Sequence, residues 1–180
     1  MNIIDRDQQA YDKCRFYTGV GSRRTPAELL PKMTAGANYL MLENFILRSG
    51  GAVGADSAFE ANVHDWSMKE IYLIWKNSNN HQSPYYGVSN EAMEIASQFH
   101  PNWDACSSIA RKLHGRNVYQ LLGPKMNKPS EFVLCYTPDG KDVGGTGQTL
   151  RMARHWNIPV FNIGVTPLNI IADQIKEIIG

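Results

Sequence analysis

The chain has 180 residues, of which 43% are hydrophobic, so it can bury one core of ordinary size and we expect a single domain over residues 1–180. Its 18 basic and 17 acidic residues nearly cancel, which disfavours a broad surface for DNA or anionic lipid. The N-terminus is polar, and no uninterrupted apolar stretch approaches the roughly 18 residues of a membrane helix, so we expect no membrane partner.

The first part of the chain predicts a strand, a helix and a second strand. The helix start is signalled by Thr25 as a cap, Pro26 at the first helical position and Glu28 three residues after the cap. The expected elements are a lead-in segment over 1–12, a strand over 13–19, a helix over 25–43, and a strand with its turn over 45–51.

The rest of the chain continues the alternation of strands and helices. Alternating strands and helices predict a Rossmann-like three-layer α/β sandwich, with a mostly parallel sheet of about five or more strands and helices on both faces. The expected elements are a helix from residue 54, a strand over 71–75, a long loop over 76–90, helices over 90–99 and 102–113, a helical turn over 117–123, a strand over 131–136, a glycine-rich loop leading into a helix, a strand over 159–163 and a helix over 168–179.

Three glycine-rich turns share one design, because each follows a predicted strand and opens a predicted helix. The unpaired amides and positive dipole end of such a helix can bind an anion. Arg23 in the first turn can hold a phosphate through two parallel hydrogen bonds. Asp56 in the second turn either complements the helix dipole or binds a ribose hydroxyl. The candidate ligand-binding residues are Gly19, Gly21, Ser22 and Arg23; Gly50, Gly51, Ala52, Gly54 and Asp56; and Gly144, Gly145, Thr146, Gly147, Gln148 and Thr149.

The third turn, GGTGQT at 144–149, is the most specific of the three, because this pattern is rarely needed for turning alone. It is not a Walker motif, since no Gly-Lys-Ser/Thr follows, and the first turn lacks the third glycine of the dinucleotide fingerprint. ATP hydrolysis and hydride transfer are therefore disfavoured. No nucleophile motif of the G-x-S-x-G type is present.

The three cysteines, Cys14, Cys106 and Cys135, lie far apart without CxxC spacing, which argues against a disulfide framework and a zinc site. His64, His81, His100 and His155 show no metal-ligand spacing, and the lone His114 is expected to be structural rather than a proton carrier. We expect no metal and no cofactor, and this cysteine usage favours a cytoplasmic location.

Four segments together resemble the SLOG superfamily of Rossmann-like proteins, which includes DNA-processing protein A and the lonely-guy phosphoribohydrolases. They are GSR at 21–23, RSGGAVGAD at 48–56, LHGRN at 113–117 and GGTGQT at 144–149, and the resemblance covers about residues 15–164. It implies a nucleotide-binding domain that associates as a homodimer or a larger homo-oligomer.

In the phosphoribohydrolase branch, the resemblance implies that an arginine and a glutamate together break the bond between base and ribose 5′-phosphate. Arg116 matches the catalytic arginine, and Asn117 replaces the following lysine. Arg151 stands where the glutamate is expected, and a cation there opposes the oxocarbenium character of the transition state. The chemistry is expected to be slow or absent unless Asp142, Asp56 or Glu91 substitutes.

Three functions follow from this pattern. The favoured one is binding of a nucleotide or nucleotide-derived small molecule by a sensor, carrier or sequestering protein, with Arg23, Arg116 and Arg151 neutralising phosphates. The alternative is an N-glycosidase that acts on nucleoside 5′-monophosphates, with Arg116 and Asn117 at its site. The third is a recombination mediator that binds single-stranded DNA, which the near-neutral composition favours less.

Overall fold

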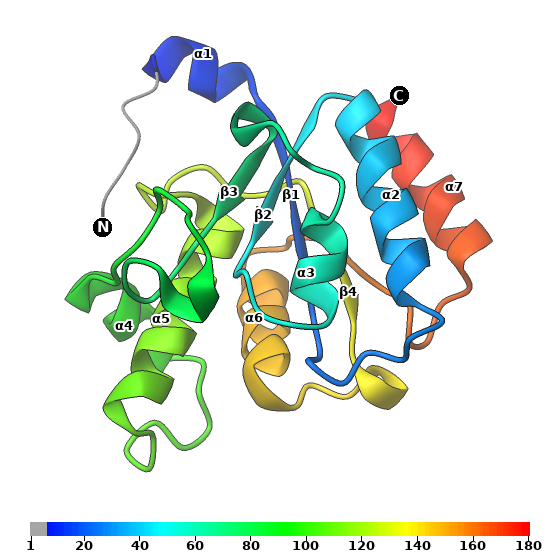
Figure 1. The fold of residues 1–180 in the computed structure, drawn as a ribbon. Helices are drawn as coiled ribbons and strands as arrows, with labels where there is room; N and C mark the ends of the chain where they lie inside the picture. Colours follow the sequence, from blue (N-terminus) through cyan, green and yellow to red (C-terminus); the bar gives the residue numbers. More distant parts are fainter. Residues whose placement is uncertain (1–6) are drawn as a thin grey trace.

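The computed structural model describes residues 7–180, which form a five-stranded, all-parallel sheet in the order β3-β2-β1-β4-β5 (Figure 1). This arrangement confirms the predicted Rossmann-like α/β class. The strands are β1 (Arg15–Gly21), β2 (Phe45–Ser49), β3 (Lys69–Ile71), β4 (Phe132–Tyr136) and β5 (Val160–Asn162). The helices are α1 (Gln8–Lys13), α2 (Leu30–Leu42), α3 (Ala55–Glu60), α4 (Asn90–Ser97), α5 (Ser108–Leu122), α6 (Gly144–His155) and α7 (Leu168–Ile179).

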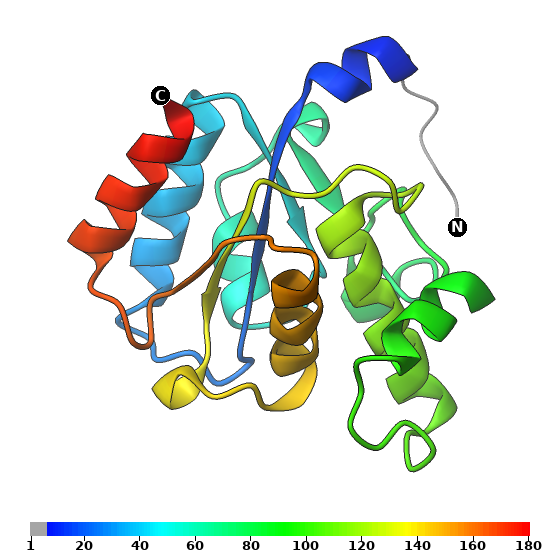
Figure 2. The same cartoon turned by 180° about the vertical axis from the view of Figure 1, so that it is seen from behind.

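Two hydrophobic cores lie on the two faces of the sheet. One core joins the strands to α2, α3 and α7, and the other joins them to α4, α5 and α6. Successive residues of a strand point to opposite faces, so Tyr17 of β1 enters the first core and Val20 the second. Figures 1 and 2 show α2 and α7 side by side at one end of the sheet. Within residues 7–180, no helix is long and apolar enough to span a membrane.

The first long helix begins four residues later than predicted. Its N-cap is Leu29, and the hydroxyl of Thr25 donates instead to the carbonyl of Ser22 at 2.6 Å. The expected capping box is therefore wrong. The same Ser22 carbonyl accepts the N–H of Ala55 at 3.4 Å, so the segment after β1 is held against the start of α3.

The LHGRN segment lies inside α5, which runs unbroken from Ser108 to Leu122, so the predicted division into two helical pieces is wrong. Gly115 does not interrupt this helix. A Cβ added there would lie 2.7 Å from the side chain of Val88 and 2.9 Å from that of Met93. The glycine therefore lets α5 approach α4 and the segment before it.

Two further boundaries differ from the sequence expectation. The part of the lead-in segment that the structure describes contains α1, capped by the side chain of Asp7; residues 1–6 lie outside the described residues. Strand β3 pairs with β2 through Lys69–Ile71, although the strand was predicted over 71–75. Residues 72–74 are buried but Trp75 is exposed, and Leu73 makes an isolated bridge with Tyr86 in the long loop.

A buried ion pair joins β2 to β3. Arg48 donates to Glu70 at 2.8 Å, and both side chains are fully buried. The hydroxyls of Tyr11 and Tyr72 also bond to Glu70, at 3.3 and 2.6 Å. The guanidinium of Arg48 stacks on the ring of Phe16 at 3.8 Å and so attaches α1 and β1 to the same network.

Candidate functional site

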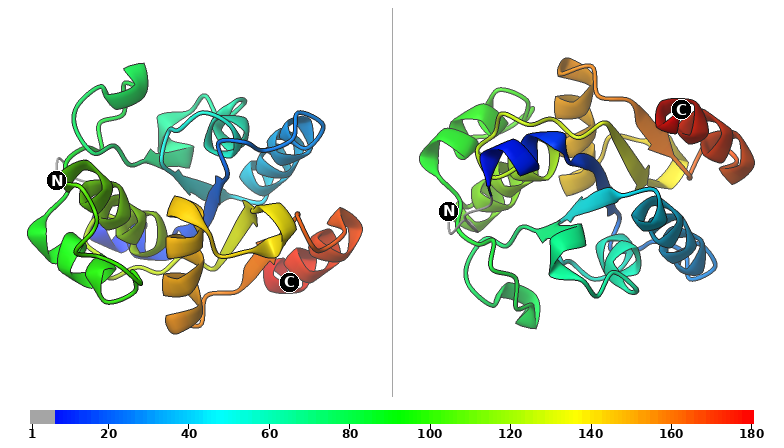
Figure 3. Two further views of the ribbon diagram at one scale, coloured as in Figure 1. Left: turned by 90° about the horizontal axis from the view of Figure 1, so that it is seen from below. Right: turned by 90° about the horizontal axis from the view of Figure 1, so that it is seen from above.

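The three predicted turns meet at one end of the sheet and line a cavity of about 710 Å³. In a parallel sheet all carboxyl ends of the strands lie at one edge, and the left view of Figure 3 looks at that edge. The lining residues that the sequence analysis named are Gly21, Ser22, Arg23, Ala52, Asp56, Arg116, Asn117, Gly144, Gly145, Thr146, Thr149 and Arg151.

Helix α6 presents its N-terminus to this cavity. Its N-cap is Val143, which makes no side-chain capping hydrogen bond within the described chain. By helix geometry the first-turn amides of Gly144, Gly145 and Thr146 have no partner inside the helix. The side chain of Asn117 donates to the carbonyl of Gly145 at 3.0 Å and ties this turn to α5. The helix start is thus an anchored, uncapped group of N–H donors.

Helix α5 supplies the polar wall on the other side of the cavity. Arg116 donates from Nη1 to the carbonyl of Gly50 at 2.9 Å, so it holds the second turn. Its Nε is buried and has no hydrogen-bond partner among residues 7–180. One helical turn further on, the buried Nε2 of Gln120 is likewise without a partner in the described structure. Residues four apart lie on one helix face, so Arg116 and Gln120 line the same wall of the cavity.

Asp56 lies beneath Arg116 and is 4% exposed. Burial raises the pKa of its carboxyl group, and the Arg116 guanidinium and the N–H groups of Ala52, Gly21 and Gly50 oppose that rise. Burial in turn lowers the pKa of Arg116, against the attraction of Asp56. The two groups therefore compensate each other's charge at the floor of the cavity.

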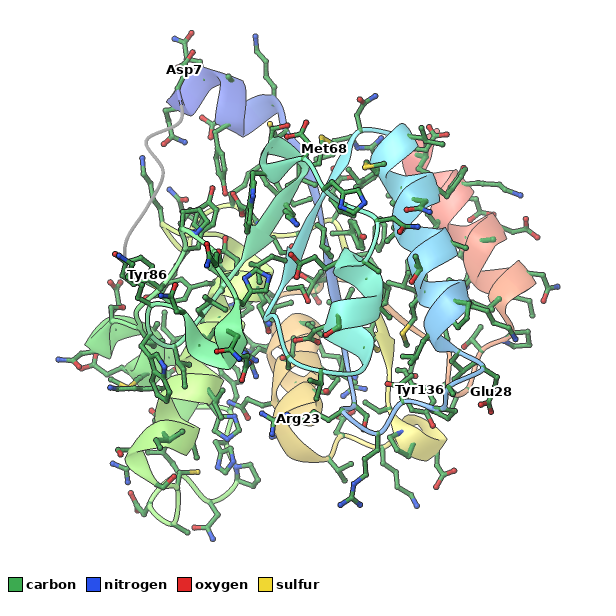
Figure 4. All side chains as sticks on the ribbon, in the orientation of Figure 1. Asp7, Arg23, Glu28, Met68, Tyr86 and Tyr136 are labelled. Carbon is green, nitrogen blue, oxygen red and sulfur yellow. The ribbon has the colours of Figure 1, made fainter. Side chains whose placement is uncertain are left out.

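The other arginines of the cavity differ in how they are held. Arg151 donates to the carbonyls of Phe99 and Asp142 and to the side chain of Gln148, at 2.9, 3.1 and 2.8 Å. Its guanidinium thus joins the loop after α4 to the start of α6 while lining the cavity. Arg23, labelled in Figure 4, and the neighbouring Arg24 are both exposed and both line the cavity.

Six of the named residues do not line the cavity, and their surroundings explain several of them by packing. A Cβ on Gly19 would lie 2.8 Å from Leu47 and from Phe59, and one on Gly147 would lie 2.2 Å from the backbone of Asp142. Gln148 is buried and donates to the carbonyl of Ala96. The six are Gly19, Gly50, Gly51, Gly54, Gly147 and Gln148.

Several lining residues were not named as candidates from the sequence. Gln120 belongs to no motif, and only its helical spacing from Arg116 could have indicated it. Arg24 belongs to the first turn but was not chosen as a candidate. His114 was considered and read as structural; burial, with neighbouring His100, Arg151 and Arg116, lowers its pKa to about 4. The added lining residues are Val20, Arg24, His100, Pro101, Ala110, Leu113, His114, Gln120, Thr137, Pro138 and Val143. Asp142, named above as a possible substitute for the glutamate, lines the cavity as well.

Comparison with known proteins gives a likeness at the level of fold. The sequence matches no protein-family model and no curated protein. Among solved structures, the fold is similar to DNA-processing protein A from Helicobacter pylori, whose structure was determined to describe its single-stranded DNA binding mode. The match has a TM-score of 0.52 and 14% identity, and covers 87% of this chain and 68% of that chain. The likeness supports the Rossmann-like fold, while membership of the SLOG superfamily stays a prediction.

Proposed function

We propose that this protein binds a phosphate-bearing nucleotide or nucleotide-derived small molecule in the cavity at the carboxyl ends of its strands. The observation that carries the proposal is a set of unsatisfied donors on residues that line this cavity. Buried polar groups in folded proteins nearly always have a partner, so the free Nε of Arg116 and Nε2 of Gln120 require a polar ligand or water.

The charge of the cavity favours an anion. Arg23, Arg24, Arg116 and Arg151 line it, against two carboxylates. One of these, Asp56, is compensated by Arg116, and the other, on Asp142, is paired with Arg154 outside the cavity. The uncapped start of α6 adds N–H donors and a positive dipole end. A phosphate group between α5 and α6 would satisfy both sets of donors.

The size of the cavity favours a small ligand over a nucleic-acid strand. About 710 Å³ lies within the range of pockets that enclose single small molecules. The likeness to a DNA-processing protein A supports single-stranded DNA as a second candidate, since a strand could place one phosphate in the same cavity. DNA binding would then depend steeply on salt, because each neutralised phosphate releases counterions.

The experiment is calorimetric titration with inorganic phosphate, nucleoside mono- and diphosphates, cyclic nucleotides and ADP-ribose, in EDTA. We expect binding of at least one nucleotide and a loss in Arg116→Met of about 10- to 150-fold, the equivalent of one charged hydrogen bond of about 1.5–3 kcal/mol. Lys112→Met is the matched control, because Lys112 lies exposed on the same helix and outside the cavity.

Each outcome of this titration decides between the candidates. If no nucleotide binds at about millimolar concentration, the proposal is wrong. If only a single-stranded oligonucleotide binds, with a steep salt dependence, DNA binding replaces nucleotide binding as the proposed function. Release of free base from a bound monophosphate would indicate N-glycosidase activity, with Asp56 or Asp142 as the carboxylate.

A further inference from the structure

Three metal-ligating side chains gather at the rim of the cavity. His100 follows α4, Cys106 lies in the loop before α5, and His114 lies on α5 itself. One donor atom from each lies within 4.8 Å of the other two. The Sγ of Cys106 lies 3.7 Å from both ring nitrogens of His100, and the two imidazole rings are 4.5 Å apart between centroids.

These separations are close to those of a zinc site. With Zn–S of about 2.3 Å and Zn–N of about 2.0–2.1 Å in a tetrahedron, ligand atoms lie about 3.4–3.6 Å apart. The sulfur is already near that distance, and the widest separation in the cluster needs to close by about 1 Å. The cysteine lies in a short surface loop, where such a shift is inexpensive.

The three donor side chains are incompletely engaged in hydrogen bonds. The Nδ1 of His114 is buried and makes no hydrogen bond within the described part of the chain. Besides its 3.7 Å contacts with His100, the thiol of Cys106 makes a long contact, 3.6 Å, with the carbonyl of Asn102. His100 Nδ1 accepts the N–H of Asn102 at 3.2 Å, a bond that a metal on this nitrogen would replace. The Trp103 ring packs near both imidazoles, at 6.0 and 6.1 Å, and restricts their orientation.

We propose that His100, Cys106 and His114 bind a divalent transition metal, with Zn²⁺ the best fit, and leave its fourth position open to the cavity. Imidazole and thiolate together are the ligands that zinc prefers. Binding removes the thiol proton to solvent and leaves a site of net charge +1. His100 and His114 both line the cavity, so the open position faces the space assigned above to the anionic ligand.

Only the contact between the open fourth position of the metal and the anionic ligand rests on the proposed function. That contact can be measured, because it would couple metal binding to anion binding. A cation at the rim that contacts the bound anion strengthens anion binding, and the anion strengthens metal binding by the same factor. The metal site itself is tested without any nucleotide.

The experiment is titration of the reduced, EDTA-stripped protein with Zn²⁺, followed by Co²⁺ as a spectroscopic probe. We expect one equivalent of Zn²⁺ per chain and, with Co²⁺, a thiolate-to-metal charge-transfer band and the strong visible absorption of tetrahedral coordination. Loss of an outer-shell partner of a metal ligand weakens metal binding by about 10- to 100-fold. Cys106→Ser and His114→Gln each remove a ligand itself, so each should weaken Zn²⁺ binding by at least that factor.

Cys14→Ser is the matched control, because Cys14 is also a half-buried free cysteine but lies at the end of α1. It should bind metal like the wild type. Absence of Zn²⁺ binding at about 0.1 mM, or a Co²⁺ complex of the wild type without thiolate charge transfer, overturns the proposal. The wild-type spectrum decides even if a variant fails to fold. Nucleotide binding that persists in EDTA while metal binding fails separates this proposal from the proposed function.

Discussion

Two glycines of the third turn allow the packing and the ligand explanations of the GGTG motif to be separated. Gly145 and Gly147 both lie in the first turn of α6. A Cβ on Gly147 would lie 2.2 Å from the carbonyl carbon of Asp142, whereas a Cβ on Gly145 meets no described atom within 4 Å. Packing therefore explains Gly147 and leaves Gly145 without a structural reason. Gly145 lines the cavity.

The expected stabilities follow from these distances. Carbon atoms in contact lie about 3.5 Å apart, so Gly147→Ala must displace the Asp142 backbone by about 1.3 Å. Overpacking of this kind costs about 1–3 kcal/mol, and the helix propensity of alanine returns up to about 1 kcal/mol. We expect a net loss of about 1–2 kcal/mol, or about 2–8 °C in melting temperature at this chain length. Gly145→Ala should be neutral or more stable by up to about 1 kcal/mol.

Nucleotide binding should depend on Gly145, although the stability of the protein does not. A methyl group there fills the space through which an anion reaches the α6 amides, so nucleotide affinity should fall at least about tenfold, near 1.4 kcal/mol, in a protein that is no less stable. Thermal and urea unfolding measure the stabilities, and calorimetry measures the affinity. Equal melting temperatures for the two variants would refute the packing argument, and wild-type affinity in Gly145→Ala would refute the ligand argument.

Arg48→Met should lower the free energy of unfolding by about 3–5 kcal/mol because it leaves the Glu70 carboxylate buried and unpaired, and adding Glu70→Gln should recover much of that loss in a double-mutant cycle. The pKa of His114 is about 6.5 in the unfolded chain and about 4 in the folded protein, so the unfolded chain binds a proton first as the pH falls. The free energy of unfolding in EDTA should therefore fall by about 1–2 kcal/mol between pH 6.5 and pH 4, a value reduced for the partial exposure of the ring. His114→Gln should flatten that pH profile of urea unfolding; an unchanged slope would assign it to other groups. Arg151→Met loses three hydrogen bonds and should lower the free energy of unfolding by about 2 kcal/mol, as measured by urea unfolding. If it weakened nucleotide binding more than Arg116→Met does, Arg151 would be a ligand-binding residue rather than a mainly structural one.

The sequence predicts most of the fold because its signals are local and agree with one another. The last helix has the predicted bounds, Leu168–Ile179, since its apolar period is strong and Pro167 precedes it. The start of α2 was misplaced because Thr25 bonds back to Ser22, a competition that the capping pattern does not reveal. The predicted gap between residues 113 and 117 is absent from α5, and the close contact of Gly115 with Val88 and Met93 has no local signature in the sequence.

The sequence also predicted one part of the candidate site and missed another. The turns converge because parallel topology brings strand ends together, which the alternation of elements already implied. Their division into cavity-lining and packing glycines depends on neighbours distant in sequence. The spacing rules that argued against zinc consider cysteine pairs, and His100, Cys106 and His114 meet only through the fold. Self-association, implied by the resemblance, stays a prediction that light scattering can test.

Helix α5 is unbroken, so His114, Arg116 and Gln120 all lie on one continuous helix. His114 and Gln120 are six residues apart, about 9 Å along the axis. A helix resists bending far more than it resists a small slide or rotation against its neighbours, so a displacement at His114 is carried to Arg116 and Gln120. If α5 moves when the rim is occupied, the wall of the cavity would move with it, so occupancy at one place would be felt at the other.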